Sequence, residues 1–208
     1  MIVEFFGPPA VGKTTIARLF AERTGGVIIS ISSRKEKYYY ILRFVFLRPI
    51  LFLALVWKTK WEGRRSLSLM WHKLFLLSEH ISYTEKALSY SHDTLVLLDG
   101  GLLQYALSLY EHRISKSTAE RYLKNFMFSD TVIVLTGDTA VCERRMRERG
   151  RMPREHLPIN HKKWLFLVNM NTNCFTKILQ TMEKTHVYNT VEVNTQTIVT
   201  LVSKVIQS

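Results

Sequence analysis

Cysteine is scarce in this sequence, and its few cysteines form no recognisable binding pattern. The 208 residues include two cysteines, Cys142 and Cys174, which stand far apart and belong to no CxxC pair. The seven histidines also lack metal-ligand spacing. These features argue against a disulfide-stabilised fold and against a zinc site. We expect two reduced thiols in a cytoplasmic protein.

A long uninterrupted apolar run is also missing. The most apolar stretch, residues 44–57, contains Arg48 and Pro49, whereas a membrane span needs about 20 apolar residues. Pro49 should end or kink a helix. The stretch is flanked by basic residues, which are Arg43, Lys58, Lys60, Arg64 and Arg65. Two interpretations stay open: a partly exposed cap helix, or a surface within residues 38–65 that touches an anionic membrane or a lipid-linked substrate.

The sequence shows no internal repeat and no low-complexity linker. Its length fits a single domain over residues 1–208, and its composition of 47% hydrophobic and 22% charged residues is that of a globular protein. A β-like run begins at residue 2. We therefore expect no signal peptide ahead of it.

Positive charge, by contrast, is abundant, with a net charge of +12. Residues 31–90 contain eleven Lys/Arg and four acidic residues, and residues 143–155 contain six Arg and three Glu. A field of this kind attracts anionic partners such as nucleotides, nucleic acids or acidic lipids. The charge alone does not select among them.

The most specific motif lies near the start of the chain. Residues 7–14 read Gly-Pro-Pro-Ala-Val-Gly-Lys-Thr, a complete GxxxxGK[ST] phosphate-binding loop between an apolar run and a helix-like segment. Glycine amides can turn toward a phosphate there, and the helix adds its positive dipole end. Lys13 should reach the β- and γ-phosphates of ATP, and Thr14 should ligate Mg²⁺. The expected nucleotide-binding residues are Gly7, Pro8, Pro9, Ala10, Val11, Gly12, Lys13, Thr14 and Thr15.

Five short β-like runs alternate with helix-like segments. The runs are Ile2–Phe6, Val27–Ser30, Thr94–Leu98, Thr131–Leu135 and Val191–Val193. The helix-like segments are 13–23, several within 34–91, 102–128, 139–149, 160–184 and 195–207. This alternation predicts an α/β fold with a five-stranded, mostly parallel, doubly wound sheet. Residues 31–93 are too long for a simple crossover, and we expect them to form a helical cap on the acceptor side.

Asp99 directly follows the predicted strand Thr94–Leu98, so it should face the same crevice as the loop that begins at Gly7. A carboxylate in this place holds Mg²⁺ in P-loop proteins, or it accepts a proton from an attacking hydroxyl. Gly100 and Gly101 should leave room for a ligand against the backbone. We take Asp99 as catalytic and, with Thr14, as a metal ligand; the alternative is an ordinary Asp-Gly turn.

An arginine-rich segment, residues 143–156, follows the fourth predicted strand. Arg144, Arg147 and Arg151 fall on one helix face, and Gly150 with the proline three residues later should end that helix in a mobile loop. Guanidinium groups on a closing loop can bind the oxygens of a phosphoryl group in transfer. We expect a catalytic lid, with a solvated basic helix as the alternative. The arginines of this lid are Arg144, Arg147, Arg149 and Arg151.

Together, the loop, the strand-end acid and the arginine-rich segment resemble the nucleoside monophosphate kinase group. Residues 138–151 are especially similar to the approach to the lid in thymidylate kinases, and the segment from 191 to 206 also fits. The resemblance covers roughly residues 1–30, 94–155 and 190–208. It implies a five-stranded parallel sheet, ATP–Mg²⁺ as phosphate donor and lid arginines on the transferred phosphate.

The acceptor side departs from that family. Thymidylate kinases follow the strand-end Asp with an Arg that grips the acceptor phosphate, whereas this chain has Gly100 and Gly101. Residues 31–93 show no recognisable motif for an acceptor base. We therefore expect a P-loop kinase whose acceptor is a hydroxyl or phosphate on a nucleotide, nucleoside, sugar or lipid-linked molecule.

Two other functions stay open. A P-loop ATPase or switch would act with a protein or membrane partner, although the guanine-reading motif Asn-Lys-x-Asp is absent from the sequence. A polynucleotide end-kinase would combine the positive charge with base stacking on aromatic residues between Tyr38 and Trp71. The sequence does not indicate the oligomeric state.

Overall fold

The protein is built around a parallel β-sheet. The computed structural model describes residues 1–90, 94–150, 154, 157, 160–182, 185–189, 197 and 200. Within these residues five strands pair in the order β2-β3-β1-β4-β5, and each pairing is parallel. The strands are β1 (Ile2–Phe6), β2 (Val27–Ile28), β3 (Val96–Leu98), β4 (Thr131–Thr136) and β5 (Thr185–Asn189). The predicted α/β fold with a parallel, doubly wound sheet is confirmed.

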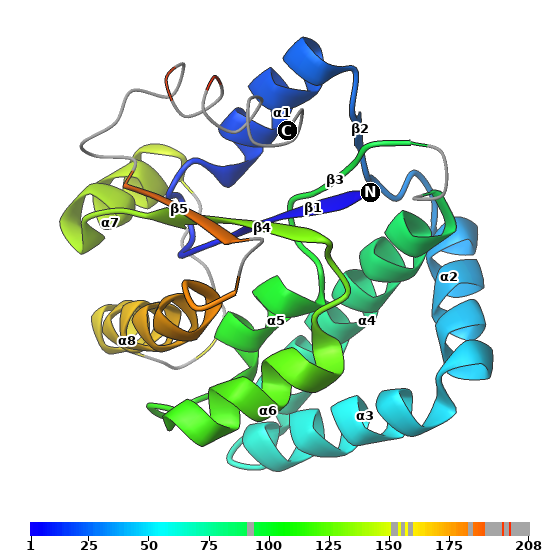
Figure 1. The fold of residues 1–208 in the computed structure, drawn as a ribbon. Helices are drawn as coiled ribbons and strands as arrows, with labels where there is room; N and C mark the ends of the chain where they lie inside the picture. The colour runs from blue at the N-terminus through cyan, green and yellow to red at the C-terminus, as the bar shows by residue number, and fades with distance from the viewer. Residues whose placement is uncertain are drawn as a thin grey trace.

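Helices cover both faces of the sheet (Figure 1). They are α1 (Lys13–Thr24), α2 (Arg34–Leu47), α3 (Pro49–Gly63), α4 (Leu67–Tyr90), α5 (Leu102–Leu109), α6 (Lys116–Phe126), α7 (Thr139–Glu148) and α8 (His161–Leu179). Alternate residues of β1 divide between the two faces, as the strand geometry requires. Val3 and Phe5 pack with Phe20 of α1 and Cys142 of α7, whereas Phe6 packs edge-on against Phe175 of α8.

The segment between β2 and β3 folds into the three helices α2, α3 and α4. Pro49 occupies the first turn of α3, and the chain bends by 112° between α2 and α3. Proline is tolerated in a first turn but cannot continue the preceding helix, because it lacks the N–H donor. The predicted helix break at Pro49 is therefore confirmed.

Among the described residues, no single helix is long and apolar enough to span a membrane. Only the bent pair of α2 and α3, taken together, has the required length and composition.

Arg48, the charge inside the most apolar stretch, is held by a buried acid. Its Nη1 lies 2.5 Å from Oε2 of Glu85, a side chain of α4 that is 1% exposed, and Arg43 donates to the other carboxylate oxygen at 2.9 Å. The Arg48 guanidinium also lies over the rings of Phe44 and Phe128. A buried carboxylate with two cations and two hydrogen bonds is compensated for its lost hydration. This cluster fastens α2 to α4.

The structure divides one predicted helix and adds one strand to the elements that were predicted. The helix predicted over residues 102–128 is divided into α5 and α6, because Ser115 caps a new helix by accepting from the amide of Thr118. The predicted strand Val191–Val193 lies outside the described residues, and the described residues contain a strand that was not predicted, Thr185–Asn189. That segment carries Val187 and Tyr188, residue types that suit strands, but it was left between the predicted helix 160–184 and the predicted strand that begins at Val191.

Candidate active site

The loop between β1 and α1 follows a path that depends on glycine. A Cβ at Gly7, whose φ is +153°, would lie 2.2 Å from the carbonyl oxygen of Leu135 in β4. Ala10 has a φ of 59° and Gly12 a φ of 109°, so the backbone repeatedly enters the left-handed region and turns its amides inward. Gly12 is the N-cap of α1 and offers no side-chain acceptor to the first-turn amides. Amide donors at a helix N-terminus that lack a side-chain cap suit an anion such as a phosphate.

Lys13 closes over this loop. Its Nζ donates to the carbonyl oxygens of Gly7 at 3.0 Å and Pro8 at 2.9 Å. Burial lowers the pKa of Lys13 to about 8, while the negative charge of Asp99 acts in the opposite direction. The ammonium thus lies in a poorly hydrated place where a phosphate would stabilise its charge.

Thr14 and Asp99 meet although they are 85 residues apart in the sequence. The Thr14 hydroxyl donates to Oδ2 of Asp99 at 2.5 Å. Burial raises the pKa of Asp99, and the Thr14 hydrogen bond and the Lys13 charge partly offset this. The other carboxylate oxygen, Oδ1, is buried and finds no partner among the described residues. The parallel strands β1 and β3 bring the two side chains to one edge of the sheet.

This pair of oxygen ligands suits Mg²⁺. The ion usually binds through one or two protein oxygens plus substrate phosphates, and it keeps several of its waters. A hydroxyl beside a carboxylate that has an unsatisfied buried oxygen meets that description. No cluster of three or more His, Cys, Asp or Glu side chains able to hold a metal occurs among the described residues.

Gln104, on α5, holds the loop in place and was missed in the sequence analysis. Its Oε1 accepts from the amide of Gly7 at 3.2 Å, and its Nε2 donates to the carbonyl of Gly7 at 3.1 Å. Its own amide donates to Oε1 of Glu4 at 3.2 Å. Glu4 is 2% exposed in the centre of β1. A glutamate within an apolar strand was the available signal, because an acid so placed needs a buried partner.

Glu4 should make stability depend on pH. Burial raises the pKa of Glu4 from 4.5 to about 7. As pH rises, the carboxyl group therefore ionises in the unfolded chain at a lower pH than in the folded one. Stability therefore falls as pH rises from 4.5 to about 7, and the cost of roughly 3 kcal/mol persists above that range. Glu4→Gln keeps an acceptor for Gln104 and removes the charge. We expect its melting temperature to exceed that of the unmodified protein by several degrees near pH 8 and to match it near pH 4.

Thermal melts of both proteins across this range test the expectation. Each shared titrating group affects both proteins equally, so the difference between the two melting temperatures isolates Glu4. A difference that stays constant with pH would contradict the raised pKa.

Gly101 makes room for the protein's own side chains, which corrects the expectation of ligand space at this glycine. A Cβ at Gly101 would lie 2.4 Å from Leu98 and 2.7 Å from the Glu4 carboxylate. Gly100 faces the imidazole of His80, whose Nδ1 lies 2.6 Å from the Gly100 carbonyl. Because a carbonyl only accepts, Nδ1 carries the proton. Burial lowers the pKa of His80 to about 4, so the ring is neutral.

The predicted lid arginines take a different arrangement. The buried side chains Cys142 and Met146 fix the inner face of α7, and Arg144 and Arg147 are exposed on its other side. Arg144 and Arg147 pair with Glu148 and Glu143 on the same helix, at 3.6 and 2.7 Å. The structure therefore brings Lys13, Thr14 and Asp99 together, but in it these two arginines bind neighbouring glutamates.

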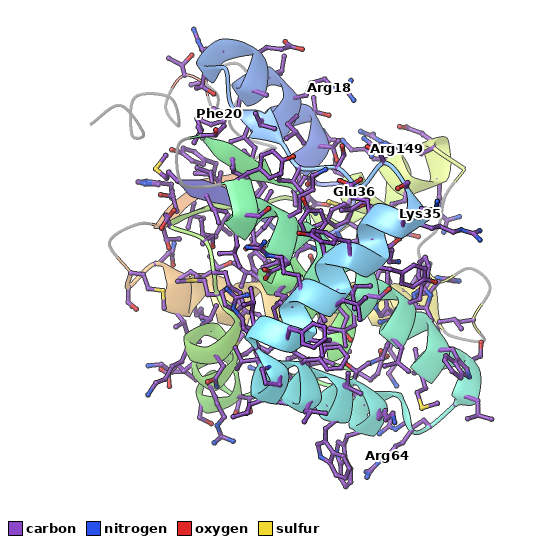
Figure 2. All side chains as sticks on the ribbon, turned by 90° about the vertical axis from the view of Figure 1, so that its right-hand side faces the viewer. Arg18, Phe20, Lys35, Glu36, Arg64 and Arg149 are labelled. Atoms are coloured by element: carbon purple, nitrogen blue, oxygen red, sulfur yellow. The ribbon has the colours of Figure 1, made fainter. Side chains whose placement is uncertain are left out.

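Helix α7 ends where the sequence predicted. Arg149 is its C-cap, and Gly150 has a φ of 60°, the left-handed conformation typical of a helix end. Figure 2 shows Arg149 at the outside of the molecule. Arg151 and Pro153 lie outside the described residues, as does most of the predicted lid after Gly150. Thr15, also expected to bind nucleotide, is exposed in the first turn of α1.

A cavity of about 400 Å³ lies between the start of α2 and the middle of α4, and we call it the α2–α4 cavity. It is lined by Ile31, Ser32, Ser33, Arg34, Lys37, Phe75, Glu79, Ser82 and Tyr83. Burial raises the pKa of the Tyr83 phenol, and the negative charges of Glu79 and Asp99 add to this effect. Lys37 lies 3.8 Å from Glu79 and over the Phe75 ring.

The rim of the α2–α4 cavity is ordered by a capping box. Ser33 accepts from the amide of Glu36, and the Glu36 carboxylate accepts from the amide of Ser32 at 2.7 Å. Lys86 of α4 then joins Glu36 at 2.5 Å and the carbonyl of Ser30 at 2.7 Å. The loop after β2 is thus fixed to α4, and the cavity is preformed.

Comparisons with known proteins match this chain by structure. Neither a family model nor a curated protein sequence matches it. Deoxyadenosine kinase from M. mycoides with bound dATP aligns over all of both chains, with 19% identity and a TM-score of 0.56. The same enzyme with the products dCMP and a flexible dCDP has 18% identity and a TM-score of 0.59 over 100% of this chain and 99% of that chain.

Shikimate kinase from Bacteroides thetaiotaomicron gives a similar result, with 14% identity and a TM-score of 0.50 over 100% of this chain and 99% of that chain. At such low identities the likeness establishes the fold. The chain has the fold of the P-loop nucleoside and nucleotide kinases, in agreement with the resemblance found in the sequence.

Proposed function

We propose that this protein is an ATP-dependent phosphotransferase that moves the γ-phosphoryl group of ATP to a small acceptor. The observation that carries the proposal is the contact between Thr14 and Asp99 beside Lys13, on a glycine-dependent loop at the N-terminus of α1. These are the parts that phosphoryl transfer requires: amides and an ammonium for the phosphates, and oxygens for a metal ion. The kinase fold supports the same reading.

On the donor side, residues 7–15 cradle the phosphates of ATP. Lys13 leaves the carbonyls of Gly7 and Pro8 and binds the β- and γ-phosphates, where its lowered pKa rises again. Thr14 and Asp99 would hold Mg²⁺, and the bound ion would neutralise part of the phosphate charge. Gln104 keeps Gly7 in position throughout.

Residues 143–156 act as a lid that closes over the transferred group. Closure brings Arg144, Arg147, Arg149 or Arg151 toward the phosphate. Arg144 and Arg147 then leave Glu148 and Glu143, their partners in the structure, and bind phosphoryl oxygens. Guanidinium groups there stabilise the charge that develops on the equatorial oxygens.

The acceptor occupies the α2–α4 cavity. Its volume of about 400 Å³ fits a molecule of nucleoside or monosaccharide size. Arg34 and Lys37 favour a polar or anionic acceptor, while Glu79 and Ser82 can bind hydroxyl groups. The acceptor oxygen forms the new P–O bond as the bond to ADP breaks. If that oxygen begins as a hydroxyl, its proton passes to a base, a role that we assign to Asp99.

Replacing Asp99 with asparagine tests this arrangement. Asn keeps an acceptor for the Thr14 hydroxyl, so we expect the variant to fold. Its acceptor-dependent turnover should fall by about 10²–10⁴-fold, the usual contribution of a general base. A rise in the Mg²⁺ concentration needed for half-maximal rate would assign Asp99 to the metal, and an unchanged requirement would assign it to the proton. Full activity in the variant would remove Asp99 from the mechanism.

The proposal as a whole is tested by coupled ADP formation. Nucleosides, nucleotides, sugars and lipid-linked acceptors are screened with ATP and Mg²⁺. Each acceptor is assayed with the unmodified protein and, for comparison, with an Arg34→Ala variant. We expect one class to give acceptor-dependent ADP, with a raised KM in the variant. ATP hydrolysis without any acceptor, stimulated by a protein or membrane partner, would favour the ATPase alternative instead.

A further inference from the structure

The exposed apolar residues of this protein are concentrated on its three central helices. Seventeen large hydrophobic side chains are exposed in the described part of the chain, and twelve of them lie between Tyr38 and Phe75. Single exposed apolar residues are ordinary, but a concentration of this kind marks an interaction surface.

Helix α3 is apolar on both sides. Leu55 is fully buried toward the core, with Leu51, Phe52 and Val56 packed beside it. The opposite side carries Ile50, Leu53, Ala54, Trp57 and Trp61 at the i, i+3, i+4, i+7 and i+11 positions of one helical stripe. We call Ile50, Leu53, Trp57 and Trp61 the outer stripe; their exposures run from 56% to 80%. Figure 1 shows α3 along the outer edge of the molecule, with α4 and α5 between it and the sheet.

Positive charge lies at one end of the outer stripe. Lys60, Arg64 and Arg65 are exposed, and none of them is paired with a carboxylate of the described residues. The Arg64 guanidinium lies 3.9 Å from the centre of the Trp61 ring. Figure 2 shows Arg64 projecting at the α3 end of the molecule, far from Lys35 and Glu36 at the start of α2.

We propose that the outer stripe of α3 docks on the surface of an anionic lipid bilayer. Helices of this kind lie in the plane of the membrane, with the apolar side at the acyl boundary and cations near the headgroups. Tryptophan favours that interface because its ring is apolar and its N–H is polar. Three of the four tryptophans are exposed in this region, namely Trp57 and Trp61 on α3 and Trp71 at the start of α4.

A second copy of the chain is the less suitable occupant. A two-fold contact places the same patch on both subunits. In a parallel contact, Lys60, Arg64 and Arg65 of one copy would meet the same cations of the other, which opposes association. In an antiparallel contact they would approach the other end of the stripe, where Glu85 is buried and already holds two cations, Arg43 and Arg48. An anionic headgroup layer instead complements all three charges and accommodates the indole rings.

Co-flotation of the full chain with vesicles tests the proposal. We expect binding to vesicles of equal parts phosphatidylcholine and phosphatidylglycerol, weak binding to pure phosphatidylcholine, and release by high salt. Tryptophan emission should shift to shorter wavelength on binding. Trp57→Ala and Trp61→Ala should each weaken binding by about tenfold or more. Arg64→Gln and Arg65→Gln should each weaken it by about fivefold.

Matched controls lie on other helices. Phe166 of α8 is 64% exposed and Lys116 of α6 has an 80% exposed side chain. Phe166→Ala and Lys116→Gln should leave flotation unchanged, and circular dichroism verifies the fold of every variant. Absence of binding to the phosphatidylglycerol vesicles would overturn the proposal, as would equal binding by the stripe variants. Dimerisation that Trp57→Ala abolishes would overturn it too, in favour of a contact between copies. Since no arm measures phosphoryl transfer, the result is independent of the kinase assignment.

Discussion

Replacing Lys13 with alanine is expected to abolish phosphoryl transfer while leaving the protein folded. The ammonium is the one cation that the structure places on the loop, bonded to the carbonyls of Gly7 and Pro8. Without it the developing charge on the phosphates loses its nearest compensation, and we expect turnover to fall by about 10³-fold or more. Steady-state ADP formation and ATP calorimetry measure the loss of rate and of affinity.

Stability should change little in this variant. Burial lowers the pKa of Lys13 to about 8, which means that its charge is disfavoured in the folded chain without ligand. Removing that charge should therefore keep the melting temperature equal or raise it slightly. Lys116→Ala, on an exposed part of α6, is the matched control and should retain full activity. Undiminished turnover by Lys13→Ala would refute the proposed function.

Replacing Arg147 with alanine is expected to reduce the rate far more than the affinity for ATP. In the structure this side chain is 64% exposed and bonds Glu143 at 2.7 Å, so it contributes only when the lid closes. A phosphate-clamping arginine accounts for about 10³-fold in turnover. We expect a decrease of this order in kcat, with a much smaller change in the Kd for ATP.

Two companion variants test the interpretation of Arg147. Glu143→Gln removes its partner in the structure and should leave kcat unchanged or raise it, because the guanidinium is then free to reach the phosphate. Arg121→Ala, on the exposed side of α6, removes an arginine of equal charge far from the loop and should have no effect. Normal kcat with weakened ATP binding in Arg147→Ala would show that this arginine binds the nucleotide without assisting transfer.

The fold was predictable because its strands are short, apolar and regularly separated by helices. Continuous runs such as Ile2–Phe6 and Thr131–Leu135 can only be covered on both faces, and parallel pairing follows. The strand Thr185–Asn189 was not predicted because it lies beside a long helix with no strong turn signal between them. Short strands at a sheet edge have the weakest sequence signature.

The candidate site was predictable only in part. The glycine-rich loop is local, since its spacing alone determines which residues can approach a phosphate. Glu4, Gln104 and His80 carry no such pattern. Their positions depend on contacts between β1, α5, α4 and the turn after β3, elements up to 100 residues apart. The expectation of ligand space at Gly101 was wrong for the same reason. The space that a Cβ would fill there is taken by the carboxylate of Glu4, which is distant in the sequence.

The sequence by itself determined the parallel α/β architecture, the phosphate loop and the break at Pro49, since each is encoded by neighbouring residues through periodicity or backbone freedom. Only the tertiary structure decided that Glu4 and Gln104 fasten the loop, and that α3 turns its tryptophans outward. Burial and long-range contact are properties of the packed chain. A helix that is apolar on all sides does not reveal in its sequence which side the core will cover.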